Sequence, residues 1–341
     1  MRVLVVTSIF LSGHGNFVAE QVRSIRSAKI DVDVLFFDPR QNRANYASNL
    51  PRIIRAIGSR RYDIIHTHHT YTMILVDIAK RLTRSTTPTV LTHHEPETLD
   101  SEGRTRTWHP TSQLRHSKRL KRFAARRADF VIFVSRQLAT TLAIDRPQDV
   151  IPCGVDLGKF RPLDRMESRR RLGLPADRPM FFFPPHPKNR RKRFELARQA
   201  YELVRAELPD VLIVTGGDIH ADTMPLYYNA ADVMVQTSYC EASPTVVKEA
   251  LACELPVVST DVGDTREMIE GVPHCWVCPE EPRELAKRIL EANGHRAQGA
   301  RDHLLRKGLG LEQVAQRVTQ VYEQVLNGRP HGFKVAALDP K

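Results

Sequence analysis

Short apolar runs recur along the chain, separated by longer stretches in which apolar and polar residues alternate with a helical period. The runs are Val3–Val6, Val32–Phe37, Ile64–Ile65, Thr89–Leu91 and Phe130–Val134 in the first half, then Met180–Phe183, Val211–Val214, Val233–Val235, Val257–Val258 and Cys275–Val277. Such runs alternating with helices are typical of buried strands in parallel sheets. The pattern predicts an α/β chain made of βα units.

The two series of runs predict two Rossmann-like, doubly wound parallel-sheet domains. Between them, the segment Ile151–Pro162 contains Pro and Gly and has no helical period, so we place the boundary there, with domains over 1–155 and 156–313. Ligands of open α/β sheets bind beyond the carboxyl ends of the strands. We therefore expect the site in a cleft between the two domains.

Composition agrees with an ordinary globular protein. Of the 341 residues, 41% are hydrophobic and 26% charged, and no apolar run reaches the ~18 residues of a membrane-spanning helix. Five unevenly spaced cysteines indicate a reducing compartment. The N-terminal apolar run breaks at Ser12-Gly13 and is typical of a first strand, not of a signal peptide. We expect a cytoplasmic protein.

The richest stretch for chemistry is Thr237–Asp264, in which a strand is followed by a loop, a helix and another strand. Ser243 is a good N-cap with Pro244 at the first helical position, so Glu241 lies in the loop and Glu249 in the second turn. A helix N-terminus suits a phosphate, and a carboxylate beside it can accept hydrogen bonds from sugar hydroxyls. From spacing alone, a loop charge and a solvated helix residue explain the two glutamates equally well.

This stretch resembles the E-x7-E signature of family 4 of the GT-B glycosyltransferases, a retaining group that uses nucleotide sugars. Other segments agree in the same order: the strand Ala128–Ser135, the element Ile151–Phe160 with Cys153 in place of the usual Asn, and Pro256–Gly263 after the signature. The resemblance implies a GT-B fold over residues 1 to 327, a C-terminal stretch (314–341) that packs back on the first domain, and no metal cofactor.

The resemblance also assigns roles. Glu249 would hold the ribose hydroxyls of the nucleotide and Glu241 would contact the donor sugar near the reacting carbon. The residues that would face the diphosphate are Ala242, Ser243, Pro244, Thr245 and Val246.

A run of basic residues follows the first strand of the second half and would neutralise the leaving diphosphate. Lys192 matches the lysine of the family best, Arg190 is our choice for the second cation, and Lys188 belongs to the same donor-binding set. The usual Gly-Arg pair is replaced by Pro184-Pro185-His186. Taken alone, such a run is typical of a solvated loop.

In the first domain, Gly15 lies in a glycine-containing βα turn that we expect to close over the donor phosphate. Two histidine clusters follow strands. By resemblance His94 is the histidine near the donor sugar, with His93 as the alternative, and His66, His68 and His69 have acceptor-side or structural roles. No further ligand stands at metal-binding spacing beside them, so we predict no metal site.

Residues 1–150 hold 24 Lys and Arg against 13 Asp and Glu, a net charge of +11, whereas the remainder is near neutral. Nine of these basic residues fall between Arg104 and Arg127, a stretch without acids. A basic amphipathic helix can lie on an anionic membrane. We hypothesise peripheral attachment to the inner face of the membrane through 104–127, against the alternative of a solvated face. No nucleic-acid motif accompanies the stretch, so we expect no nucleic-acid partner.

Together these features predict a metal-independent, retaining glycosyltransferase that moves a sugar from a nucleotide sugar to the hydroxyl of a glycan, a lipid-linked sugar or a small molecule. UDP- and GDP-sugars are the expected donors. The segment between Gly216 and Met224 is short, which abbreviates the pocket for the base. The alternatives are a GT-B sugar-nucleotide epimerase or hydrolase, and a non-enzymatic basic binding protein.

Overall fold

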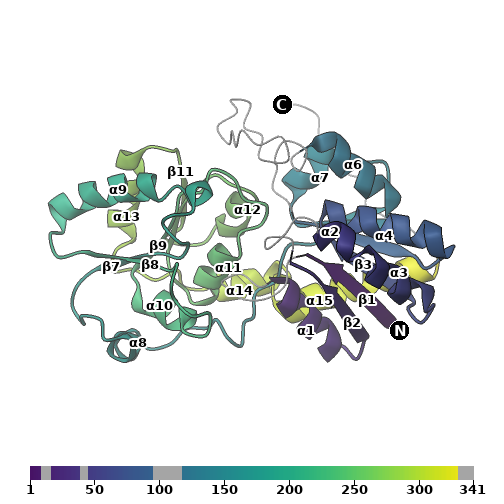
Figure 1. The fold of residues 1–341 in the computed structure, drawn as a ribbon. Coiled ribbons are helices and arrows are strands. Elements are labelled where there is room, and N and C mark those ends of the chain that lie inside the picture. Colours follow the sequence, from purple (N-terminus) through teal and green to yellow (C-terminus); the bar gives the residue numbers. More distant parts are fainter. Residues whose placement is uncertain (9–16, 39–44, 95–116, 329–341) are drawn as a thin grey trace. The chain divides into compact units, whose positions relative to one another are not determined.

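The computed structural model describes residues 1–8, 17–38, 45–94 and 117–328 (Figure 1). Two compact units make up the chain. The N-terminal unit contains the described residues up to Cys153 and those from Glu312 onward, and the C-terminal unit is Gly154–Leu311. Each unit is built around its own parallel sheet, as the apolar runs predicted.

The sheet of the N-terminal unit has the order β2-β1-β3-β4-β5-β6, and its described strands all run parallel. Its strands are β1 (Arg2–Thr7), β2 (Asp31–Phe36), β3 (Ile64–His68), β4 (Thr89–His93), β5 (Phe130–Phe133) and β6 (Gln148–Val150). Its helices are α1 (Phe17–Ser27), α2 (Asn45–Ser48), α3 (Leu50–Gly58), α4 (Thr70–Thr83), α6 (Lys118–Arg127), α7 (Arg136–Leu142) and α15 (Leu311–Leu326). The central strands β3, β4 and β5 are buried throughout, as expected for a sheet covered on both faces.

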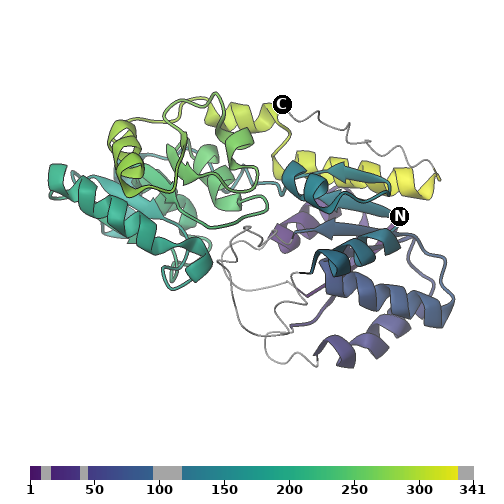
Figure 2. The ribbon, with the colours of Figure 1, turned by 90° about the horizontal axis from the view of Figure 1, so that it is seen from above.

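Helix α15 returns from the end of the chain to cover the N-terminal sheet (Figures 1 and 2). Its Val314, Val318 and Tyr322 are buried in one hydrophobic cluster with Val3 and Val5 of β1. The amphipathic spacing of this helix places these side chains on a single face. The first and last elements of the chain therefore share one core.

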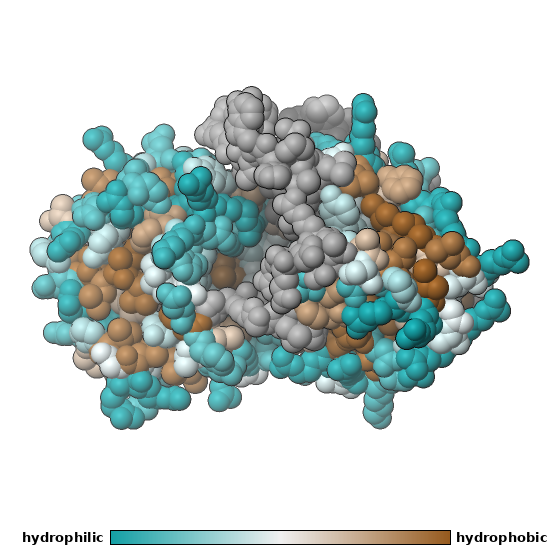
Figure 3. All heavy atoms as spheres, viewed as in Figure 1, coloured by the Kyte–Doolittle hydropathy of each residue, from teal (hydrophilic) through white to brown (hydrophobic). Residues whose placement is uncertain are grey.

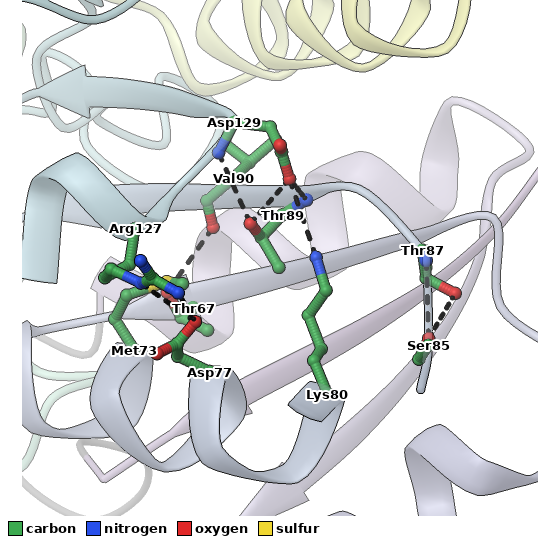
Figure 4. Close-up of polar contacts among 10 residues, drawn as sticks. All are labelled: Thr67, Met73, Asp77, Lys80, Ser85, Thr87, Thr89, Val90, Arg127 and Asp129. Carbon is green, nitrogen blue, oxygen red and sulfur yellow. Dashed lines mark hydrogen bonds and ion pairs between the residues drawn. The ribbon is translucent and has the colours of Figure 1, made fainter. Parts of the chain in front are cut away.

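Polar contacts fasten α6 to α4 and to the strands beside it (Figure 4). Arg127 at the end of α6 pairs with Asp77 of α4, with 3.0 Å between Nη2 and Oδ1. Just before β5, Asp129 accepts hydrogen bonds from the backbone and the hydroxyl of Thr89, at 2.7 and 2.8 Å, and lies 3.7 Å from the ammonium of Lys80. These contacts fix the orientation of α6.

The sheet of the C-terminal unit has the order β11-β10-β9-β7-β8 and is also parallel in its described pairs. Its strands are β7 (Met180–Phe183), β8 (Leu212–Thr215), β9 (Val233–Gln236), β10 (Val257–Thr260) and β11 (Trp276–Cys278). Its helices are α8 (Arg165–Leu172), the 3-10 turn η1 (Arg190–Lys192), α9 (Phe194–Glu207), α10 (Met224–Ala230), α11 (Thr245–Ala252), α12 (Thr265–Ile269), α13 (Pro282–Ala292) and α14 (Ala300–Arg306). The candidate residues of this unit follow β7, β9 and β10, at the carboxyl edge of the sheet.

Candidate active site

Glu241 lies at the carboxyl edge of the C-terminal sheet between two cations. Its carboxylate accepts hydrogen bonds from Lys192 Nζ at 2.6 Å and from Arg191 Nη1 at 2.9 Å. The Glu241 side chain is only 8% exposed and that of Lys192 15%. Burial by itself raises the pKa of the Glu241 carboxyl, but the charges of Lys192 and Arg191 outweigh it and hold this pKa below its usual value. The carboxylate is therefore ionised at neutral pH, and the cluster keeps a net positive charge.

The two loops that carry this cluster are joined through their backbones. Thr237 Oγ1 donates to the carbonyl oxygens of Lys192 (3.2 Å) and Arg193 (2.8 Å), and the amide of Tyr239 donates to the carbonyl of Arg191 (2.9 Å). Arg191 also donates to the carbonyl of Cys240 at 3.1 Å. The positions of the cations are thus fixed relative to Glu241.

The cation that joins Lys192 at Glu241 is Arg191, whereas the sequence analysis chose Arg190 as the second cation for the diphosphate. Asn189 caps η1 by accepting a hydrogen bond from the amide of Arg191, and the turn directs Arg191 toward Glu241. The side chains of Arg190 and Lys188 are exposed. Neighbouring cations in a tight turn point in different directions, and the sequence alone could not tell which one meets the carboxylate.

The helix after Glu241 begins one residue later than predicted. Helix α11 starts at Thr245, so Pro244 occupies the capping position and the side chain of Ser243 is not a cap. Instead, Ser243 Oγ donates to Asp264 Oδ2 at 2.7 Å and accepts a hydrogen bond from Lys248 Nζ. Of the other residues assigned to the diphosphate, Ala242 is buried and Val246 half-buried. Ser243 therefore forms a hydrogen bond with Asp264, which is distant in sequence, instead of capping the helix.

Glu249 lies in α11 and is held from α10. Tyr228 Oη donates to Glu249 Oε2 at 2.7 Å, and the Tyr228 ring is completely buried against Phe160 and Phe182. Burial and the neighbouring carboxylate raise the pKa of Tyr228 well above its usual value, so the phenol remains a hydrogen-bond donor. The structure therefore fixes one carboxylate oxygen of Glu249.

Glycines bring further segments against this edge. Gly263 has φ +60°, and a Cβ there would lie 2.6 Å from the carbonyl oxygen of Ala242. After β8, a Cβ on Gly216 would lie 1.9 Å from the carbonyl oxygen of Pro184. Only glycine allows these two approaches. The segment at Pro184 replaces the Gly-Arg pair of the family. Through the contact with Gly216 it lies directly against the short connection between β8 and α10.

The histidines of the N-terminal unit form a buried row along β3 and β4. The ring nitrogens of His66 lie 2.6 Å from Tyr322 Oη and 2.7 Å from Thr92 Oγ1, and those of His94 lie 2.9 Å from His68 Nδ1 and 3.6 Å from Cys153 Sγ. Burial lowers the pKa of His66 to about 3, and burial with the neighbouring rings lowers the pKa of His68 and His94 well below the usual value.

His66, His68 and His94 are therefore neutral, and the contacts of His66 favour its structural alternative. His69 and His93 are also buried. Among the described residues, no group of three or more His, Cys, Asp or Glu side chains is arranged to hold a metal ion. Gly15 lies outside the described residues.

Two family models match this chain. The model for Glycosyltransferase Family 4 matches residues 6–159, and the model for Glycosyl transferases group 1 matches residues 188–293, which include Lys192, Glu241 and Glu249. Both halves of the chain therefore match glycosyltransferase families.

Curated proteins named as glycosyltransferases are similar to parts of this chain. A putative teichuronic acid biosynthesis glycosyltransferase, TuaC of Bacillus subtilis, is 32% identical over 156 residues, which are 41% of this chain and 40% of TuaC. A D-inositol 3-phosphate glycosyltransferase of Frankia alni is 28% identical over a stretch that covers 52% of this chain and 53% of the Frankia protein. The chain spans about half the length of the curated relatives it matches.

Solved structures show the fold. Anabaena HepE in complex with UDP and glucose superposes with a TM-score of 0.72 at 17% identity, covering 95% of this chain and 100% of HepE. The fold predicted from the sequence, two parallel-sheet α/β domains of the GT-B type, is confirmed.

Several residues of the candidate site were not singled out by the sequence analysis. They are Arg191, Tyr228, Lys248 and Asp264. Two of them carried a signal: Arg191 is in the basic run, and Lys248 directly precedes Glu249. Tyr228 and Asp264 lie outside the stretch from Glu241 to Glu249. The packing of α10 on α11 brings Tyr228 to Glu249, and the turn after β10 brings Asp264 to Ser243.

Proposed function

We propose that this protein is a retaining glycosyltransferase that moves a sugar from a nucleotide sugar to an acceptor hydroxyl. The observation that carries the proposal is the cluster of Glu241, Arg191 and Lys192 beside the start of α11, with Glu249 in the same helix. One carboxylate and two cations leave an excess positive charge, which suits a diphosphate. The second carboxylate suits vicinal hydroxyls.

The donor would bind to the C-terminal unit. Glu249, oriented by Tyr228, would accept hydrogen bonds from the ribose hydroxyls, and the first turn of α11 would face the diphosphate. We propose that Lys192 and Arg191, and not a divalent ion, stabilise the charge that develops on the leaving diphosphate. Fixed cations aimed at developing charge contribute a few kcal/mol to the transition state.

The donor nucleotide is proposed to be uridine or guanosine diphosphate. The structure of HepE with UDP and glucose, a protein of the same fold, supports uridine. The name of TuaC, which refers to teichuronic acid biosynthesis, supports a glycan as acceptor, and the name of the D-inositol 3-phosphate glycosyltransferase supports a small molecule. We propose that the N-terminal unit presents this acceptor.

We further propose peripheral attachment to the cytoplasmic face of an anionic membrane. Among the residues that the structure describes, no helix combines the length and apolar character needed to cross a bilayer. On α6, Arg119 and Arg126 are exposed, and so is Phe123, at 52%. Ile78 and Leu82 of α4 are also exposed, and Figure 3 shows hydrophobic side chains over this helix.

Other basic residues of α6 are used within the unit. Lys121 is buried, Arg122 donates to the carbonyl of Leu142 at 2.7 Å, and Arg127 pairs with Asp77 (Figure 4). The membrane hypothesis therefore rests on fewer cations of this helix than the sequence suggested. Each basic side chain near an anionic surface contributes ~1 kcal/mol.

Flotation with anionic liposomes tests this attachment. Arg119→Glu with Arg126→Glu should abolish flotation at low salt, whereas the control pair Arg171→Glu with Arg205→Glu, exposed arginines of the C-terminal unit, should leave it intact. Equal flotation of both variants, or none of the wild type, would reject membrane attachment.

Thermal shift against UDP-, GDP-, ADP- and dTDP-sugars tests the donor site. A donor at about one hundred times its Kd should stabilise the protein by about 2.7 kcal/mol. The shift should be lost in Glu249→Ala. With the donor known, incubation with sugar acceptors and NMR of the product would show the retained anomeric configuration. Epimerisation or hydrolysis without an acceptor would instead identify the epimerase alternative, and no binding of any donor would reject the proposal.

A further inference from the structure

A buried polar relay adjoins the loop that carries Glu241. Lys248 Nζ donates a hydrogen bond to Ser243 Oγ at 2.5 Å, and Ser243 Oγ donates to Asp264 Oδ2 at 2.7 Å. Lys248 is 0% exposed, Asp264 5% and Ser243 9%. The three side chains come from the loop after β9, from α11 and from the turn after β10. The relay therefore links three consecutive segments at the carboxyl edge of the sheet.

Stability alone does not explain this arrangement. Two buried charges are costly to desolvate, and apolar side chains of similar volume often stabilise a core at least as well. Lys248 also lies in the first turn of α11, where the helix dipole disfavours a positive charge. A methionine would fill the same space without either cost.

The relay acts on the loop from Glu241 to Thr245. Gly263 approaches the carbonyl oxygen of Ala242 so closely that no Cβ fits between them, and Asp264, the next residue, holds Ser243. On the other side, Thr237 and Tyr239 are bonded to the turn that bears Lys192. The start of α11 is thereby held in one conformation from both sides.

We propose that Lys248, Ser243 and Asp264 are positioning residues, which hold residues 241–246 ready to receive the terminal phosphate of a nucleoside diphosphate. The inference rests on the proposed function and adds residues that act through the loop without touching the nucleotide. Donors that are already fixed bind an anion more tightly, because no ordering is needed on binding.

Two variants test the relay: Ser243→Ala, and the double variant Lys248→Met with Asp264→Asn, which removes both charges together. In the ligand-free protein, hydrogen exchange of the amides of residues 241–243, 245 and 246 should rise about tenfold while that of β7 stays the same. Affinity for UDP or GDP should fall roughly tenfold, and affinity for UMP or GMP should change by less than about twofold. A general structural defect would weaken diphosphate and monophosphate alike.

Arg165→Met is the matched control. Arg165 pairs with the buried Asp232 at 2.7 Å, but Asp232 directly precedes β9 and so lies at the opposite edge of the parallel sheet. This variant should change neither the loop exchange nor the ratio of diphosphate to monophosphate affinity.

Two results would overturn the relay: unchanged exchange of 241–246 in folded variants, or an equal loss of affinity for di- and monophosphates. If the wild type binds no nucleoside diphosphate, the proposed function fails, and the exchange measurement still decides whether the relay orders the loop.

Discussion

Acid should destabilise the N-terminal unit through His66. The pKa of this ring is lowered to about 3, against 6.5 for an exposed imidazole, and the ring is completely buried. Between these two values the unfolded chain binds a proton that the folded unit excludes, so the free energy of unfolding decreases as the pH falls. The slope is about 1.4 kcal/mol per pH unit, which gives a loss of about 2 kcal/mol between about pH 7.5 and about pH 5.

The perturbation is His66→Gln, which removes the titration and keeps a hydrogen-bonding side chain between Tyr322 and Thr92. We expect the variant to be less stable at neutral pH. Its loss of stability on going to about pH 5 should be smaller than that of the wild type by about 2 kcal/mol. Urea unfolding at both pH values, monitored by hydrogen exchange of the amides in β1 and β3, measures this difference for the N-terminal unit alone.

His220→Gln is the control, since this side chain is 78% exposed in the C-terminal unit. It should leave the pH dependence of the N-terminal unit unchanged. Proton NMR of the wild type gives an independent measure, because the ring of His66 should show no protonation down to about pH 5. The reasoning is refuted if His66 titrates near its ordinary value, or if His66→Gln and the wild type lose the same stability in acid.

Three further substitutions have defined outcomes. Tyr228→Phe removes the hydrogen bond to Glu249 and should weaken nucleotide binding roughly tenfold in calorimetry, with little change in the melting temperature. Lys192→Met should lower kcat by roughly 10²–10³-fold in a donor-consumption assay, and a normal kcat would exclude this cation from the chemistry. Arg169→Met leaves the buried Asp232 without one partner and should destabilise the protein by about 3–5 kcal/mol in urea unfolding, while nucleotide affinity of the folded fraction stays the same.

The sequence predicted the strands well because parallel strands are buried on both faces and must be apolar. Each predicted run, such as Phe130–Val134 or Met180–Phe183, coincides with a strand or overlaps one. Strand β6 was missed, because Gln148–Val150 is short, lies at the sheet edge and contains one apolar residue. Hydrophobic runs cannot mark a strand of that kind.

The candidate site was predicted less completely, since its contacts join residues far apart in sequence. Ser243 has the local preferences of an N-cap, but Asp264, 21 residues away, takes its hydroxyl. That Arg191, and not Arg190, contacts Glu241 depends on the geometry of one tight turn. The sequence analysis identified the two histidine clusters, but it could not identify the partner of His66, which is Tyr322, 256 residues further along the chain. Such pairs follow from topology and not from local pattern.

The return of α15 to the N-terminal unit also sets the order in which the chain can mature on the ribosome. Strand β1 is synthesised long before α15, yet the core around Val3 and Val5 is completed only by Val318 and Tyr322 of that helix. Gly154–Leu311, by contrast, has all its own strands as soon as it has emerged. The later-made unit can therefore fold first, while the earlier one has an apolar sheet face that is only partly covered, by α1, until α15 has been made. During that interval the exposed apolar surface is prone to aggregation.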